Sequence, residues 1–155
     1  FGATFLMPNE PQANIIMVCT GTGSAPFRAF TMHRERMNPE SDAPLTLFFG
    51  ARSPDALPYF GPLKKVPDSL LRQHLVYSRL DGQPKEYVQD RMRAEAATLA
   101  PMLSDPHTYV YVCGLKDMEP GVEAAFAEIA TQSGQDWSTV KDRMRDEGRF
   151  HVETY

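Results

Sequence analysis

A glycine-rich segment, residues 20–26 (TGTGSAP), is the first part of the sequence whose spacing could bind a ligand. Glycine tolerates positive φ and lets a ligand come close to the backbone. A helix predicted to begin at Pro26 would add unpaired N–H groups and a partial positive charge, which together suit a phosphate. For a lone Gly-x-Gly a plain turn is the safer interpretation. Here the segment follows the first strand of an alternating α/β pattern, which favours phosphate binding.

This turn departs from the common dinucleotide fingerprint at two points. Pro26 stands where Gly-x-Gly-x-x-Gly has its third glycine, and Arg52 rather than an acidic residue follows the second apolar run. No lysine follows the turn as it does in a P-loop. The segment therefore disfavours a standard NAD-linked dehydrogenase and a P-loop NTPase.

A second cluster of phosphate-binding residue types lies within ten positions: Ser78, Arg79, Lys85 and Tyr87. A dianionic phosphate is well bound by a forked guanidinium, a second cation and short hydroxyl donors, and a tyrosine ring can stack on adenine. The plainer interpretation is that the two cations are solvated loop residues, partly neutralised by Asp81. Four such residues beyond the end of one strand favour a 2′-phosphate site.

Short apolar runs alternate with helical patterns along the chain, and these elements must position the two clusters. The runs predict five strands, at residues 14–19, 45–49, 75–78, 109–113 and 150–154. Helices are predicted at residues 26–37, 88–99 and 122–129, and around Trp137, Val140 and Met144, with stops at Gly134 and Gly148. The proline-rich residues 54–67 predict a short helix or an irregular loop.

Strands that alternate with helices predict a three-layer α/β/α domain with a five-stranded parallel, Rossmann-like sheet. Ligands of such sheets bind beyond the carboxyl ends of the strands. Residues 1–11 are expected to be the end of a connection from a preceding domain and residues 12–155 the domain itself. Because Phe1 is not an initiator methionine, we expect a piece of a longer protein, with any targeting signal upstream.

Composition excludes several classes. A net charge of −4 argues against nucleic-acid binding, and no apolar run approaches the roughly 20 residues that span a bilayer. Cys19 and Cys113 are far apart and the four histidines show no ligand spacing, so neither a metal site nor a disulfide is expected. Buried free thiols fit a reducing compartment, and we expect the cytoplasm.

Five segments in order resemble the ferredoxin–NADP reductase family. They are residues 21–28 (GTGSAPFR), 78–79 (SR), 85–89 (KEYVQ), 109–119 (YVYVCGLKDME) and 152–155 (VETY). Each is weak alone, but five with matching spacing are specific, and together they extend through nearly the whole chain. Residues 48–52 (FFGAR) and 149–155 (RFHVETY) most resemble the reductase component of bacterial benzoyl-CoA epoxidases.

The resemblance implies a flavin-binding β-barrel followed by an NADP-binding sheet. Hydride would pass from NADPH to FAD, and electrons would leave to a ferredoxin-like, iron–sulfur or oxygenase partner. The family's flavin motif is not found in these residues, so this chain would bind NADP(H) but hold no flavin tightly. Iron–sulfur clusters could lie elsewhere in the full-length protein.

The resemblance also implies roles for individual residues. Cys113 would shape the nicotinamide site without acting as a nucleophile, the Glu153 carboxylate would order it, and the Tyr155 ring would cover the flavin. Thr154 replaces the family's usual aliphatic residue. Thr20, Gly21, Thr22, Gly23, Pro26, Arg28, Gln89, Gly114, Leu115 and Met118 would contact the cofactor beside the 2′-phosphate cluster.

Plainer interpretations remain for several of these residues. Cys113 is equally a small buried apolar residue, Met118 a packing residue, Arg28 a helix-surface cation, and a terminal tyrosine means little by itself. Two other classes also remain open: a nucleotide-binding module without redox chemistry, and an NAD-linked dehydrogenase domain.

Overall fold

The computed structural model of the chain describes residues 6–37, 40, 43, 45–53 and 66–155. The predicted loop or helix at residues 54–67 lies almost wholly outside these residues. No helix of the described part is both long and apolar enough to cross a lipid bilayer.

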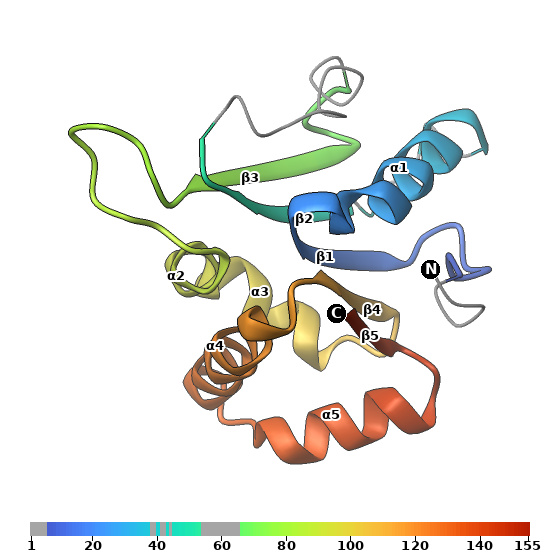
Figure 1. Ribbon diagram of the computed structural model, residues 1–155. Coiled ribbons are helices and arrows are strands. Elements are labelled where there is room, and N and C mark those ends of the chain that lie inside the picture. The colour runs from blue at the N-terminus through green and yellow to red at the C-terminus, as the bar shows by residue number, and fades with distance from the viewer. Residues whose placement is uncertain (1–5, 38–39, 41–42, 44, 54–65) are drawn as a thin grey trace.

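Five parallel strands form one sheet in the order β3-β2-β1-β4-β5, as predicted for a Rossmann-like domain (Figure 1). The strands are β1 (Asn14–Thr20), β2 (Leu45–Ala51), β3 (Leu71–Tyr77), β4 (Thr108–Gly114) and β5 (Phe150–Thr154). The central strands are continuously apolar because helices cover both faces of the sheet.

The α-helix α1 (Ala25–Met37) covers one face of the sheet, and the four other α-helices cover the opposite face (Figure 1). Successive side chains of a strand alternate between faces, so Ile15 and Met17 pack with α1 while Ile16 and Val18 pack with the four-helix layer. The helices are η1 (Gly21–Ser24), α1 (Ala25–Met37), α2 (Val88–Ala94), α3 (Ala96–Ser104), η4 (Lys116–Met118), α4 (Glu119–Gln132) and α5 (Trp137–Asp146).

Most element boundaries agree with the sequence prediction, and two differ substantially. β3 begins at Leu71, four residues before the predicted start, because Arg72, Gln73 and His74 interrupt the apolar run. The helix predicted at residues 88–99 is two helices, interrupted at Glu95, whose N–H donates to the carbonyls of both Arg91 and Met92. The predicted stops at Gly134 and Gly148 are confirmed, and both have positive φ.

The interruption at Glu95 leaves the apolar face of the predicted helix intact. Val88 and Met92 on α2, and Ala96 and Leu99 on α3, are all buried in the same core. The break therefore redirects the chain without exposing the core, and it places the Glu95 side chain beside β3.

Candidate functional site at the carboxyl edge of the sheet

The glycine turn follows β1 directly at the carboxyl edge of the sheet. Thr20 is the last residue of β1, and Gly21 opens η1 with a φ of 55°, a conformation that L side chains adopt at a cost. A Cβ built on Gly21 would meet nothing within 4 Å, so the backbone is open to a ligand. Thr22 and Gly23 lie in η1, and Pro26 is the second residue of α1 rather than the predicted first.

The Thr20 side chain joins this turn to the loop that follows β4. Its hydroxyl accepts a hydrogen bond from the Leu115 N–H (3.2 Å) and donates to the Met118 sulfur (3.4 Å). Gly114 has a φ of 147°, and a Cβ there would lie 2.5 Å from the Thr20 hydroxyl oxygen. Only glycine permits so close an approach. Five predicted site residues (Thr20, Gly21, Gly114, Leu115 and Met118) are thus brought together.

The loop after β3 carries the predicted 2′-phosphate cluster to the same edge. Backbone hydrogen bonds continue the β2–β3 pairing beyond the strands: Ser78 N–H to Ala51 carbonyl (3.0 Å) and Arg79 N–H to Arg52 carbonyl (2.8 Å). The Glu86 N–H then bonds the Tyr77 carbonyl (3.2 Å), which returns the loop to the sheet. The backbone that carries the cluster is therefore fixed at both ends.

The side chains of this cluster fit a phosphate ligand. Arg79 and Lys85 are exposed, and neither forms a hydrogen bond or ion pair with the side chain of any described residue, Asp81 included. Ser78 is half-buried and Tyr87 is exposed. Two unpaired cations next to a hydroxyl and an exposed ring are the donor set that a 2′-phosphoadenosine needs.

Cys113 and Glu153 lie side by side in the register of β4 and β5, and Cys19 is aligned with Cys113 on β1. Both cysteines are free and fully buried. Burial, and secondarily the Glu153 carboxylate, raises the pKa of the Cys113 thiol to about 11. Burial likewise raises the pKa of Cys19. At neutral pH Cys113 is therefore a protonated thiol, which agrees with a shaping role and excludes a resident thiolate nucleophile.

Tyr155 is joined by its backbone to the loop after β4. Its N–H donates to the Gly114 carbonyl (3.0 Å), and its carbonyl accepts from the Lys116 N–H (3.0 Å). The neighbouring Thr154 hydroxyl bonds the Glu119 carboxylate at the start of α4. The Tyr155 side chain, 57% exposed, is thus placed next to Gly114 at the carboxyl edge.

Comparison with known proteins identifies the family of this domain. Residues 17–124 match the family model described as "Oxidoreductase NAD-binding domain". The chain belongs to the oxidoreductase NAD-binding domain family. Its sheet order and helical layers are those of the Rossmann-like NAD(P)-binding domain of the ferredoxin–NADP reductase type.

Relatives with this domain include three ferredoxin–NADP reductases, each aligned over 99% of the chain. The Synechocystis sp. enzyme is 36% identical, the Thermosynechococcus vestitus enzyme 37%, and the chloroplastic leaf isozyme 1 of Oryza sativa subsp. japonica 37%. The chain spans 40%, 42% and 45% of their respective lengths. It therefore corresponds to somewhat less than half of each relative.

Arg52 is a candidate that the sequence interpretation of this NAD-binding domain did not include. It directly follows β2, is exposed, and has its carbonyl bonded to the Arg79 N–H. This hydrogen bond places the backbones of Arg52 and Arg79 next to each other at the carboxyl edge. The signal was present in the sequence: a cation at the position where NAD-specific domains have an acid.

Two predicted cofactor-binding residues, Gln89 and Arg28, have surroundings that do not by themselves indicate a ligand. Gln89 is half-buried against α4, where a Cβ built on Gly121 would lie 2.7 Å from its Nε2 atom, so packing accounts for this side chain. Arg28 is exposed on α1, without a hydrogen bond or ion pair to a described residue.

Within the described residues, no group of three or more histidine, cysteine, aspartate or glutamate side chains could hold a metal ion.

Gly50 couples the glycine turn to the start of α2. A Cβ on Gly50 would lie 3.0 Å from Cγ1 of Val88 and 3.2 Å from Cγ2 of Thr20. Val88 directly follows Tyr87, whose N–H is capped by the Asp90 carboxylate (2.9 Å). The β3–α2 loop and the glycine turn thus pack on the same last residues of β2.

Proposed function

We propose that this chain is the NADP(H)-binding domain of an FAD-dependent reductase. The intact protein would pass hydride from NADPH to flavin and electrons onward to a ferredoxin-like acceptor. One observation carries the proposal: the Cys113–Glu153 pair lies at the same sheet edge as two cations, Arg79 and Lys85, whose side chains pair with no described residue. The first pair suits a nicotinamide end and the second a 2′-phosphate end of one dinucleotide.

At the adenosine end, Ser78, Arg79 and Lys85 would bind the 2′-phosphate and Tyr87 would stack on adenine. Arg52 joins them, because its backbone is paired with that of Arg79. Each charge-assisted hydrogen bond contributes about 1.5–3 kcal/mol, enough to separate NADPH from NADH. The preference therefore depends on exposed side chains held by a fixed backbone.

At the centre, the backbone of Thr20, Gly21, Thr22 and Gly23 would bind the pyrophosphate, with Pro26 in the first turn of the helix behind it. The open space above Gly21 supports this assignment. Arg28 would add charge from α1. Gly114, Leu115 and Met118 would form the opposite wall, with Gln89 supporting it through its packing on α4.

At the nicotinamide end, the bound cofactor would supply the hydride. The protonated thiol of Cys113 would set the depth of the site, and the Glu153 carboxylate next to it would orient the ring. Tyr155 would cover the flavin face until nicotinamide reacts. No protein nucleophile is required for hydride transfer, in keeping with the raised pKa of Cys113.

A narrower proposal is that the full protein serves benzoyl-CoA epoxidation in the aerobic degradation of aromatic compounds. Its support is the resemblance of residues 48–52 and 149–155 to reductases of that system. It implies an oxygenase as electron acceptor, iron–sulfur clusters elsewhere in the polypeptide, and a cytoplasmic location. Benzoyl-CoA-dependent NADPH oxidation by the intact protein with its oxygenase tests the epoxidation proposal; oxidation with ferredoxin alone would contradict it.

We also propose that residues 1–11 connect a preceding FAD-binding domain to residues 12–155.

Binding of 2′,5′-ADP and of 5′-AMP to the chain tests the broader proposal. We expect micromolar retention of 2′,5′-ADP and much weaker binding of 5′-AMP. Equal or tighter binding of 5′-AMP would indicate an NAD-linked domain. A nucleotide-binding module without redox chemistry would also bind 2′,5′-ADP, but the intact protein would then not oxidise NADPH.

A further inference from the structure

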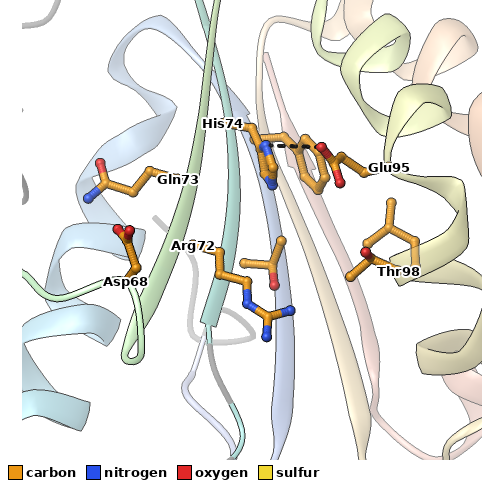
Figure 2. Close-up of a pocket in the computed structure, with 9 residues that line it drawn as sticks. Asp68, Arg72, Gln73, His74, Glu95 and Thr98 are labelled. Atoms are coloured by element: carbon orange, nitrogen blue, oxygen red, sulfur yellow. Dashed lines mark ion pairs between the residues drawn. The ribbon is translucent and has the colours of Figure 1, made fainter.

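A cavity of about 240 Å³ lies between β3 and α3, away from the carboxyl edge (Figure 2). Its walls come from the first half of β3, the neighbouring part of β2 and the first turn of α3. Arg72 and His74 on β3 are in register with Thr46 and Phe48 on β2, so all four side chains lie on one face of the sheet. Glu95 and Thr98 close the opposite side.

The apolar part of this cavity is formed by stacked rings and one buried leucine. The His74 ring lies 4.7 Å from that of Phe48 with an interplanar angle of 13°, and Leu99 is fully buried beside them. Burial is the main cause that lowers the pKa of His74, so its ring is uncharged near neutral pH. Ligand sites commonly combine such an apolar wall with a few convergent polar groups.

The polar groups of the cavity are unused by the fold. Arg72 forms no hydrogen bond or ion pair with a described residue, and neither does the hydroxyl of Thr98. The Thr46 hydroxyl is buried and lacks a partner among the residues that the structure describes. Glu95 reaches only the His74 Nδ1, at 3.8 Å, which is longer than a charge-assisted hydrogen bond.

Several charged residues on the helices of this face are paired closely. Arg91 bonds Glu86 at 2.8 Å through two nitrogens, and Lys141 bonds Glu123 at 2.6 Å. Arg93 pairs with Glu128 on α4. Arg72, which pairs with no described residue, and Glu95, which is paired only with His74 at 3.8 Å, therefore line the same cavity, and packing has not brought them together.

We propose that this cavity binds a small zwitterion of the α-amino-acid class. The ligand carboxylate would accept hydrogen bonds from the Arg72 guanidinium and the Thr98 hydroxyl, and its ammonium group would donate to Glu95. Its side chain would lie on the Phe48–His74 stack. A volume of about 240 Å³ is below the roughly 300–1,000 Å³ of pockets for drug-sized ligands and suits a small metabolite.

The arrangement of charges favours a zwitterion over a simple anion. A lone anion at Arg72 would leave the Glu95 carboxylate without a close donor and would also be repelled by it. Asp68 and Gln73 also line the cavity, but Figure 2 shows them on the other side of β3 from Glu95 and Thr98, so Glu95 is the acceptor placed beside Thr98 for the ammonium group. Arg72 and Glu95, on opposite walls, match a ligand that carries both charges.

Calorimetry and amide NMR with L-leucine test the proposal, with isovalerate and isoamylamine as probes that each carry one of the two charges. We expect L-leucine to change the amide chemical shifts of residues in β3 and α3 only, and we expect far weaker binding of both singly charged probes. Arg72→Gln and Glu95→Gln should each weaken L-leucine binding at least roughly tenfold, the loss of one charge-assisted hydrogen bond. Saturating 2′,5′-ADP should leave the affinity unchanged.

Arg93→Gln is the matched control, since it removes a paired arginine from the same layer. It should leave L-leucine binding unchanged, and urea unfolding should show that all three variants are folded. Isovalerate that binds as tightly as L-leucine would replace the proposal with a plain anion site. The absence of L-leucine binding at millimolar concentration, competition by 2′,5′-ADP, or equal affinity of Arg72→Gln and the wild type would overturn it.

Discussion

The two candidate sites of this domain differ in whether the main chain or the side chains supply their binding groups. At the carboxyl edge, backbone groups and glycines form the centre of the site, and cations stand on a loop whose ends are tied to the sheet. In the cavity beside α3, side chains from β2, β3, α3 and the break at Glu95 supply the polar groups that the ligand would meet. The first site depends on main-chain conformation and the second on side-chain identity, so they should respond differently to substitution.

The largest expected difference concerns Gly114. Gly114→Ala should lower the free energy of unfolding by roughly 2–5 kcal/mol, since it adds a strained φ and a Cβ 2.5 Å from the Thr20 hydroxyl oxygen. Gly82→Ala is the control: Gly82 also has positive φ but meets nothing within 4 Å, so only about 1–2 kcal/mol is expected. Equal losses in urea unfolding would mean that the carboxyl edge is not tightly packed around its glycines.

The next largest effect should distinguish two arginines, Arg72 near the start of β3 and Arg79 just beyond its end. Arg79→Gln should weaken 2′,5′-ADP binding by about 1.5–3 kcal/mol, while Arg72→Gln should leave it unchanged. Calorimetry at low and high salt measures both, and the Arg79 contribution should fall as salt rises. If Arg72→Gln had the larger effect, the 2′-phosphate would have to lie beside α3 instead.

A smaller effect concerns pH and the buried thiol of Cys113. Its folded-state pKa, about 11, is above the unfolded value, so its contribution to stability is complete below the unfolded pKa and is lost as pH rises toward 11. We expect the free energy of unfolding to fall by an amount of order 2 kcal/mol across that window. Cys113→Ala should flatten the profile in part, because Cys19 shows the same direction. A profile that Cys113→Ala leaves unaltered would contradict the assignment.

The smallest effect is expected inside the α3 cavity. The Glu95 carboxylate favours the imidazolium form of His74 and opposes the effect of burial. Glu95→Gln should therefore lower the pKa of His74 further, which NMR titration of its ring protons measures. Glu128→Gln, on the exposed side of α4, provides the comparison and should leave the His74 titration in place. A His74 pKa that Glu95→Gln leaves unchanged would show that Glu95 is not its neighbour in solution.

The strands were predictable where a continuous apolar run marks burial on both faces. β1 extends only one residue beyond its prediction, because such runs require burial on both sides, and the edge strand β5 also matches its prediction at both ends. β3 pairs on one side only, and Arg72-Gln73-His74 interrupts its apolar pattern, so its start was missed. Periodicity likewise could not find the break at Glu95, since the buried residues keep their spacing across it.

The carboxyl edge was predictable because its chemistry is local in sequence. A glycine turn after a strand, and a cation pair after another, must meet at one edge of a parallel sheet. The α3 cavity joins Thr46, Arg72 and Glu95 from three separate elements, and its polar groups share no motif. Only the register of β2 with β3 and the break at Glu95 bring them together, and neither can be read from local spacing.

The packing of Gly50 against Val88 and Thr20 also bears on how a two-part ligand would bind. A dinucleotide is bivalent, and its two halves would meet half-sites already held at a fixed separation on one sheet. Once one half is bound, the other experiences a high effective concentration, with little loop ordering left to oppose it. NADPH should then bind far more tightly than its separate adenosine and nicotinamide halves, and loosening the contact at Gly50 should reduce that advantage before it alters the affinity of either half.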